Sequence, residues 1–161
     1  MGRVYTLTAE GMALTDALVG DLLLIQPVAD RPFQILSCRI TQREQETATQ
    51  ARIRLVRRST IDTTAAAGTV TVTKHMTNDA AAAFTVTMNR TSATPTLGTE
   101  SGVVAILNES LPNGFVYLPT PEERPIFVGA AEFFAVHLPS PHGVTGQTVT
   151  FDVHVVVEAF G

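Results

Sequence analysis

The stretch QTVTFDVHVVVEAF (147–160) alternates polar and apolar residues more clearly than any other part of the chain. Successive side chains of a β-strand point to opposite faces of its sheet. One face of this segment would carry Val149, Phe151, Val153, Val155 and Val157. The opposite face would carry Thr150, Asp152, His154, Val156 and Glu158. The pattern predicts a long strand that packs one face into a hydrophobic core.

Similar segments recur along the chain and predict about ten strands in all. The other nine are residues 3–8, 22–26, 33–42, 50–58, 69–73, 84–88, 103–108, 114–118 and 132–138. In the third of these strands we expect Leu36, Cys38 and Ile40 to share a face. The connections are rich in Gly, Pro, Asn and Asp, which favour turns. The sequence therefore predicts an all-β fold, an antiparallel β-sandwich of the jelly-roll type.

Only two segments have the character of short helical turns. They are LTDALVGD (14–21) and NDAAAAF (78–84), for which Thr15 and Asp79 are candidate N-caps. No internal repeat or change of composition marks a domain boundary. At 161 residues the chain is expected to form one domain, residues 1–161.

Composition and charge exclude several classes of protein. The formal net charge of −4 argues against a protein that grips nucleic acid by its phosphates. No run approaches the roughly 20 apolar residues of a membrane span, and the N-terminus does not resemble an export signal. We therefore expect a soluble protein without direct contact to nucleic acid or membrane. The single cysteine excludes an internal disulfide.

Basic residues are concentrated between positions 39 and 58. The six in this region are Arg39, Arg43, Arg52, Arg54, Arg57 and Arg58. Arginine forms planar, bidentate pairs with carboxylates at interfaces. The candidate contacts to a partner are the three on the polar face of one predicted strand, Arg52, Arg54 and Arg58. The alternative is a solvated face whose arginines pair with acidic residues of other strands, such as Asp152 or Glu158.

The segment YLPTPEERP (117–125) combines three prolines with three charged residues between two apolar stretches. Prolines lower the entropy of a free loop, so less ordering is required when the loop meets a partner. The candidate contact residues are Pro119, Pro121, Glu122, Glu123 and Arg124. Alternatively, the prolines only end a strand and block edge pairing. The two adjacent glutamates would point apart on an extended chain, which disfavours a glycosidase pair.

No catalytic constellation is apparent. The string GTESG (98–102) has its serine in the wrong place for a nucleophile elbow. His137 and His154 lie on different predicted strands and share a metal only if those strands are neighbours. Cys38 alternates with apolar residues and is expected to be a small buried hydrophobe. We expect no enzymatic activity, no cofactor and no bound metal.

Four segments, taken together, carry a likeness to a known family. They are VYTLTAEGMALTDALVGDLLLIQPVADRPFQILSCRITQ (4–42), RIRLVRRST (52–60), KHMTNDAAAAFTV (74–86) and FVYLPTPEERPIFVGAAEFFAVHLP (115–139). In order and character they resemble the capsid cement, or decoration, proteins of tailed bacteriophages. The resemblance implies a jelly-roll virion protein, made in the host cytoplasm, that binds the outer surface of the head. It further implies that the protein bridges subunits of the major capsid protein, stabilises the shell and self-associates as a homodimer or homotrimer.

Two other functions remain open on the same fold. A carbohydrate- or receptor-binding appendage of the virion would need a concave aromatic patch, built from residues such as Tyr5, Tyr117, Phe115 or Phe133. The low aromatic content, 6%, disfavours it. A sandwich hydrolase would use scattered acidic residues or histidines.

Overall fold

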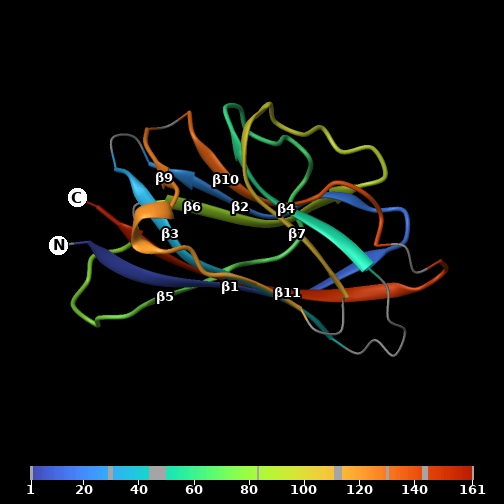
Figure 1. The fold of residues 1–161 in the computed structure, drawn as a ribbon, viewed down its shortest axis with the longest axis horizontal. Helices are drawn as coiled ribbons and strands as arrows, with labels where there is room; N and C mark the ends of the chain where they lie inside the picture. The colour runs from blue at the N-terminus through green and yellow to red at the C-terminus, as the bar shows by residue number, and fades with distance from the viewer. Residues whose placement is uncertain are drawn as a thin grey trace.

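The computed structural model describes residues 2–28, 31–43, 50–82, 84–110, 114–129, 131–142 and 145–160. These residues form eleven strands and one short 3-10 turn, η2 (Pro121–Glu123). The strands make two antiparallel sheets that lie face to face, with the chain termini together at one end (Figure 1). The all-β sandwich predicted from the sequence is therefore confirmed.

One layer is called here the β11 sheet. Its strands are β1 (Arg3–Thr15), β3 (Phe33–Arg43), β5 (Thr71–Lys74), β8 (Phe115–Tyr117), β9 (Ile126–Phe127) and β11 (Thr148–Ala159). They follow the order β5-β1-β11-β3-β8, and the short β9 also pairs with β3. The last strand of the chain is thus held between the first and the third.

The other layer is called the β10 sheet. Its strands are β2 (Val19–Pro27), β4 (Gln50–Arg58), β6 (Phe84–Ser92), β7 (Glu100–Ser110) and β10 (Phe133–Leu138). They follow the order β6-β2-β10-β4-β7.

The strand order identifies the sandwich as a jelly roll. With β5, β6 and β9 set aside, one sheet reads β1-β11-β3-β8 and the other β2-β10-β4-β7. Strands that follow one another along the chain alternate between the sheets, except for β4 and β7, which pair directly. This is the double Greek key of eight antiparallel strands. The additional strands β5 and β6 extend the two sheets beyond β1 and β2.

The core lies between the sheets and follows the predicted alternation of β11. Its residues Val149, Phe151, Val153, Val155 and Val157 are all buried. Aromatic rings close the end of the core that lies near β9. Phe127 stacks on Phe33 with ring centroids 5.1 Å apart and meets Phe134 edge-on at 5.5 Å. Such ring pairs contribute beyond the apolar area that they bury.

The prediction of helical turns at 14–21 and 78–84 is wrong for the described residues of both segments, 14–21, 78–82 and 84. Within the first segment Leu14 is a buried residue of β1, and a tight turn follows at Asp16–Ala17 before β2. Thr15 ends the strand instead of capping a helix. Asp79 donates its backbone N–H to Met76 O within a turn (3.0 Å). Isolated helical turns this short are unstable, whereas strand pairing satisfies the backbone of residues 14 and 15.

A β-bulge changes which residues of β3 face the core. The register between β11 and β3 shifts between Val156 and Val157. Ile35, Cys38 and Ile40 are buried as a result, while Leu36 is only half-buried. The prediction that Leu36 shares the face of the other two is wrong, because a bulge adds one residue and moves the alternation by one position.

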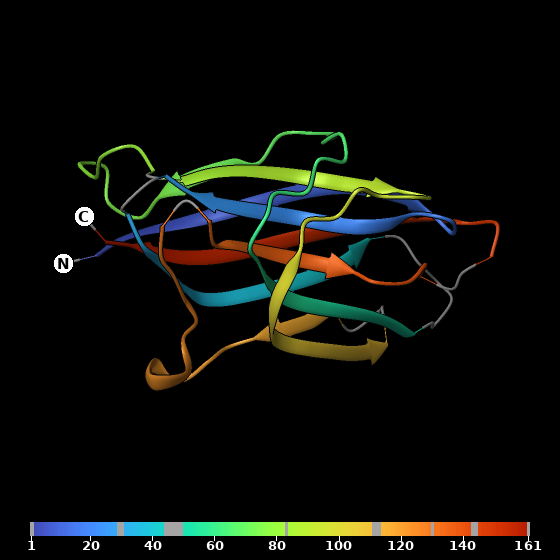
Figure 2. The same cartoon turned by 90° about the horizontal axis from the view of Figure 1, so that it is seen from above.

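Two connections cross the outer face of the β10 sheet (Figure 2). These cover segments, residues 59–70 and 93–99, are joined to each other by backbone hydrogen bonds, including Ser59 N to Thr99 O at 2.9 Å. A Cβ on Gly98 would collide with the carbonyl oxygen of Thr60, so only glycine permits this close approach. A second apolar cluster is buried on this outer face, formed by Leu24, Val56, Phe133 and Ala135. The middle of the β10 sheet is therefore buried on both sides, whereas Arg52 of β4 and Val103 and Ile106 of β7 are exposed.

We predict that Phe127→Ala lowers the free energy of unfolding by about 3–5 kcal/mol, because a fully buried ring is replaced by a cavity. The ring is 0% exposed and contacts two other phenylalanines. Urea denaturation followed by circular dichroism measures the change. The matched control is Val128→Ala at the next, exposed residue, which should alter stability by less than about 0.5 kcal/mol. Equal losses in the two variants would contradict the packing described for β9.

Candidate functional site

Most arginines of the basic region are neutralised within the chain. Arg54 pairs with Glu100 at 2.5 Å, and Arg57 pairs with Glu132 at 2.6 Å. Arg57 also lies over the ring of Phe127, 4.4 Å from its centroid. Arg43 contacts two acidic side chains, of which Asp152 is the nearer at 2.5 Å. The ion-paired alternative thus holds for these residues, although Glu100 and Glu132 were not among the partners expected from the sequence.

Arg58 lies in a buried polar cluster beneath the cover segments. It donates from Nε and Nη2 to the two carboxylate oxygens of Asp21 at 2.9 and 2.7 Å. Its Nη1 donates to the carbonyl oxygen of Gly98 at 2.7 Å. His137 Nδ1 lies 2.9 Å from Asp21 Oδ1. Arg58 is 2% exposed and Asp21 is 0% exposed, so the positive charge of Arg58 is unavailable to a partner.

The three predicted contact arginines therefore differ in their settings. Arg52 is exposed and has no ion pair with a described side chain, whereas Arg54 is paired and half-buried. The three share the polar face of one strand, as predicted, but Arg58 is buried there and unavailable to a partner. The sequence alternation places it on the outer face, but the cover segments close over that face. A docking role for Arg52 and Arg54 stays a prediction.

Asp62, in the first cover segment, belongs to the same cluster. Its Oδ1 accepts a hydrogen bond from Thr64 N at 2.7 Å, whereas its buried Oδ2 has no partner among the described residues. Burial raises the pKa of Asp62, and the neighbouring carboxylate of Asp21 raises it further. Two carboxyl groups in one enclosed site disfavour double ionisation, so the Asp62 carboxyl holds its proton to a higher pH than an exposed aspartate.

The segment 117–125 forms a rigid turn at the edge of the β11 sheet, and Figure 2 shows it projecting from the sandwich. Glu123 N donates to Thr120 O at 3.0 Å, and the Thr120 hydroxyl donates to a Glu123 carboxylate oxygen at 2.9 Å. Pro119 is buried, and Arg124 is half-buried. Pro121, Glu122 and Glu123 are exposed. Of the five predicted contact residues, three are thus accessible, and their contact role stays a prediction.

Apolar side chains flank this turn. The set called here the apolar edge consists of Val116, Leu118, Ile126 and Val128, whose exposed fractions are 65%, 75%, 47% and 59%. The sequence reasoning missed it. The sequence did contain a signal for it. Successive residues in FVYL (115–118) and PIFV (125–128) are apolar, and side chains on opposite faces of an edge strand cannot all point into the core. Exposed apolar patches of this kind mark interaction surfaces.

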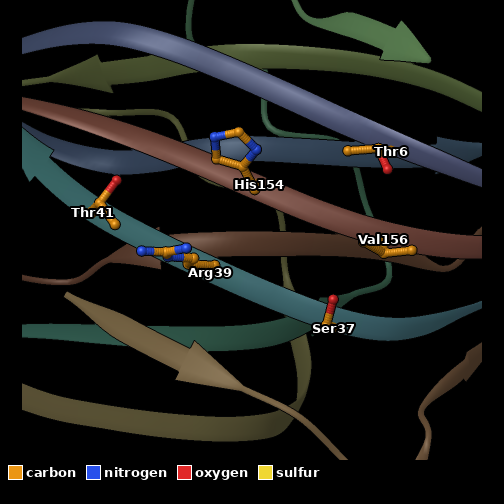
Figure 3. A pocket seen from close by; sticks show the side chains of 6 residues that line it. All are labelled: Thr6, Ser37, Arg39, Thr41, His154 and Val156. Carbon is orange, nitrogen blue, oxygen red and sulfur yellow. The ribbon is translucent and has the colours of Figure 1, made fainter.

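A shallow groove lies on the outer face of the β11 sheet. It has a volume of about 430 Å³ and is lined by Thr6, Ser37, Arg39, Thr41, His154 and Val156 (Figure 3). These residues come from β1, β3 and β11, and each alternates with residues that face the core. Arg39 is exposed and has no ion pair with a described residue. Val116 of the apolar edge is the strand partner of Arg39, so the edge adjoins the groove.

Histidines beside the groove are hydrogen-bonded to threonines. The Thr6 hydroxyl lies 2.7 Å from His75 Nε2, and the Thr8 hydroxyl lies 3.4 Å from His154 Nδ1. His154 is on β11 and His137 is on β10, so the two sheets separate the pair that the sequence left open as metal ligands. In the described part of the chain, no group of three or more His, Cys, Asp or Glu side chains could hold a metal ion.

Other candidate residues are in the interior. Cys38 is fully buried, as predicted, and burial raises its pKa to about 12, which leaves the thiol un-ionised at neutral pH. The aromatic patch expected of a carbohydrate-binding module is not formed by the residues named for it. Tyr5, Phe115 and Phe133 are buried, and only Tyr117 is partly accessible.

Comparisons of the chain with protein-family models, with curated proteins and with solved structures found no match. The resemblance to phage decoration proteins accordingly remains a prediction from the sequence. Among the described residues there is no helix long and apolar enough to cross a membrane.

We predict that Arg58→Ala lowers the free energy of unfolding by about 3–5 kcal/mol, because it leaves the buried Asp21 carboxylate without its cation. Arg52→Ala, at an exposed position of the same strand, is the matched control and should cost less than about 0.5 kcal/mol. Both values come from urea denaturation at neutral pH. A small loss in the Arg58 variant, equal to that of the control, would contradict the buried pair.

The raised pKa of Asp62 predicts a pH-dependent stability. A folded state that binds a proton more tightly than the unfolded chain is stabilised below the ordinary pKa of 3.8, and loses this contribution as the pH rises through the raised pKa. In the Asp62→Asn variant, the side-chain amide mimics the protonated acid at every pH. The stability of the wild type relative to this variant should therefore fall as the pH increases from about 4. Parallel pH profiles of the two proteins in denaturant titrations would disprove the assignment.

Proposed function

We propose that this chain is a structural protein of a phage virion, which binds the outer surface of the head and bridges neighbouring subunits of the major capsid protein. It would act as a cement protein that opposes breakage of the shell. In this proposal the protein self-associates as a small homo-oligomer and uses no cofactor. The sequence resemblance suggests the role, and the distribution of exposed and covered surfaces supports it.

The observation that carries the proposal is the difference between the outer faces of the two sheets. The β10 sheet is covered by segments 59–70 and 93–99, which bury its apolar cluster and Arg58. The β11 sheet instead has an accessible groove, and its β8–β9 side carries the apolar edge. The β10 side also exposes apolar residues, among them Val103 and Ile106 of β7 at 46% and 47%. The more exposed Val116, Leu118 and Val128 all belong to the apolar edge, which makes the β8–β9 side the better suited to adhesion.

The rigid turn at η2 fits the same role. Its conformation is fixed by Pro121 and by two hydrogen bonds between Thr120 and Glu123. Little ordering entropy would be lost when such a turn meets another protein. Repeated copies that each make modest contacts at fixed positions can together reinforce a shell.

We expect the protein in many copies on mature heads of the phage that encodes it, and we expect heads that lack it to break at a lower temperature. Gel quantification of purified heads and DNA release on heating measure these properties. Absence from mature heads, or presence in a few copies at the tail, would refute the role, as would an unchanged breakage temperature.

A matched pair of variants tests whether the protein binds heads through the apolar edge. Leu118→Asp places a charge at the most exposed position of the edge and should weaken rebinding to deficient heads, because the carboxylate would lose hydration on contact. Met76→Asp is the control: Met76 is 65% exposed, close to the 75% of Leu118, but lies outside the edge, so this variant should rebind like the wild type.

A further inference from the structure

Arg39 and Arg52 are the two exposed arginines of the basic region without an ion pair to a described residue, and of these two Arg39 lines the groove. Four of the six, Arg43, Arg54, Arg57 and Arg58, form ion pairs with described acidic residues. Arg39 forms none, and it lies on β3 between β11 and the short edge strand β8. None of the residues that line its groove is acidic. The guanidinium group therefore has its full hydrogen-bonding capacity available to a ligand.

We propose that the groove on the β11 sheet binds a carboxylate-bearing segment of a partner polypeptide, with Arg39 as the residue that binds the carboxylate. This inference rests on the proposed function and specifies the chemistry of the partner surface: an acidic side chain with apolar neighbours, presented by an extended or protruding segment.

The groove offers the groups that a carboxylate requires. A guanidinium donates two parallel hydrogen bonds to a carboxylate, which gives both strength and orientation. The hydroxyl groups of Ser37 and Thr41 line the same hollow and can donate to a further oxygen or to backbone carbonyls of the segment, whereas the Thr6 hydroxyl is already hydrogen-bonded to His75. Val156 supplies a small apolar area within the groove.

The surroundings favour a polypeptide over an acidic sugar. Val116 is the strand partner of Arg39 and is 65% exposed, so an apolar contact lies directly beside the cation. A peptide presents a carboxylate and an aliphatic side chain on neighbouring residues. Sugar-binding surfaces instead use exposed aromatic faces, and no aromatic residue lines the groove.

The inference can be tested on the full-length protein by an NMR titration with a peptide of alternating Glu and Val residues. Wild-type protein should show shifts at the amides of Ser37, Arg39 and His154. The Arg39→Ala variant should bind the peptide with about tenfold lower affinity, because the bidentate pair between the guanidinium and the carboxylate is lost. The same peptide with Gln in place of Glu should lose binding to a similar extent.

Arg31→Ala is the matched control, because it removes another exposed arginine, one that lies in the β2–β3 connection outside the groove. Its affinity for the peptide should equal that of the wild type. No shifts in the wild-type protein, or equal affinities of the Arg39 and Arg31 variants, would overturn the inference. If sialyllactose shifts the NMR signals of the groove amides and the peptide does not, the proposed peptide ligand is wrong and the groove binds an acidic glycan instead.

Two further measurements separate this inference from the role on the head. If Arg39→Glu changes the oligomeric state in sedimentation, the groove contacts a second copy of the chain and the inference fails. If wild-type protein and Arg39→Glu bind deficient heads equally, the inference fails while the cement role stands. If the wild-type protein binds the peptide through Arg39 but is absent from heads, the cement role fails alone.

Discussion

The burial of the middle of the β10 sheet on both faces is the constraint on which the surface of this protein depends. The inner face packs against the β11 sheet, and the cover segments bury the middle of the outer face. Every polar group trapped there needs a partner, since an unpaired buried charge is costly. Asp21, Arg58 and His137 meet this need in one cluster, and Gly98 allows the second cover segment to approach closely enough to accept from Arg58.

This closure covers Arg58, while the groove and the apolar edge of the other sheet stay accessible. On the arginine-rich strand β4, Arg54, Arg57 and Arg58 pair with acidic residues of other segments, and Arg57 also covers the ring of Phe127. Arg52 of the same strand and Arg39 of the opposite sheet are exposed and form no ion pair with a described residue; Arg39 lies beside the exposed Val116.

The edge of the sandwich has a related division of roles. Phe127 and the aliphatic residues on either side of it belong to one short segment, yet the ring is fully buried and Ile126 and Val128 are exposed. Alternation in a strand of only two residues is enough to anchor the segment and to present an apolar surface at the same place. Arg57 reinforces the anchor, because it donates to Ile126 O at 2.8 Å and covers the Phe127 ring.

The sequence by itself determined the strands and the core face of β11, because alternation is a local property that any half-buried strand must show. It also predicted the burial of Cys38 and the class of the fold. It did not determine the outward shift of Leu36 or the strand at Leu14, which depend on a bulge and on pairing with a segment more than a hundred residues away. Nor did it distinguish Arg58 from Arg39, since two arginines on polar strand faces look alike until distant loops cover one of them. Only the tertiary structure decides which faces are covered, because burial depends on segments brought together by folding and not on the residues beside them in the chain.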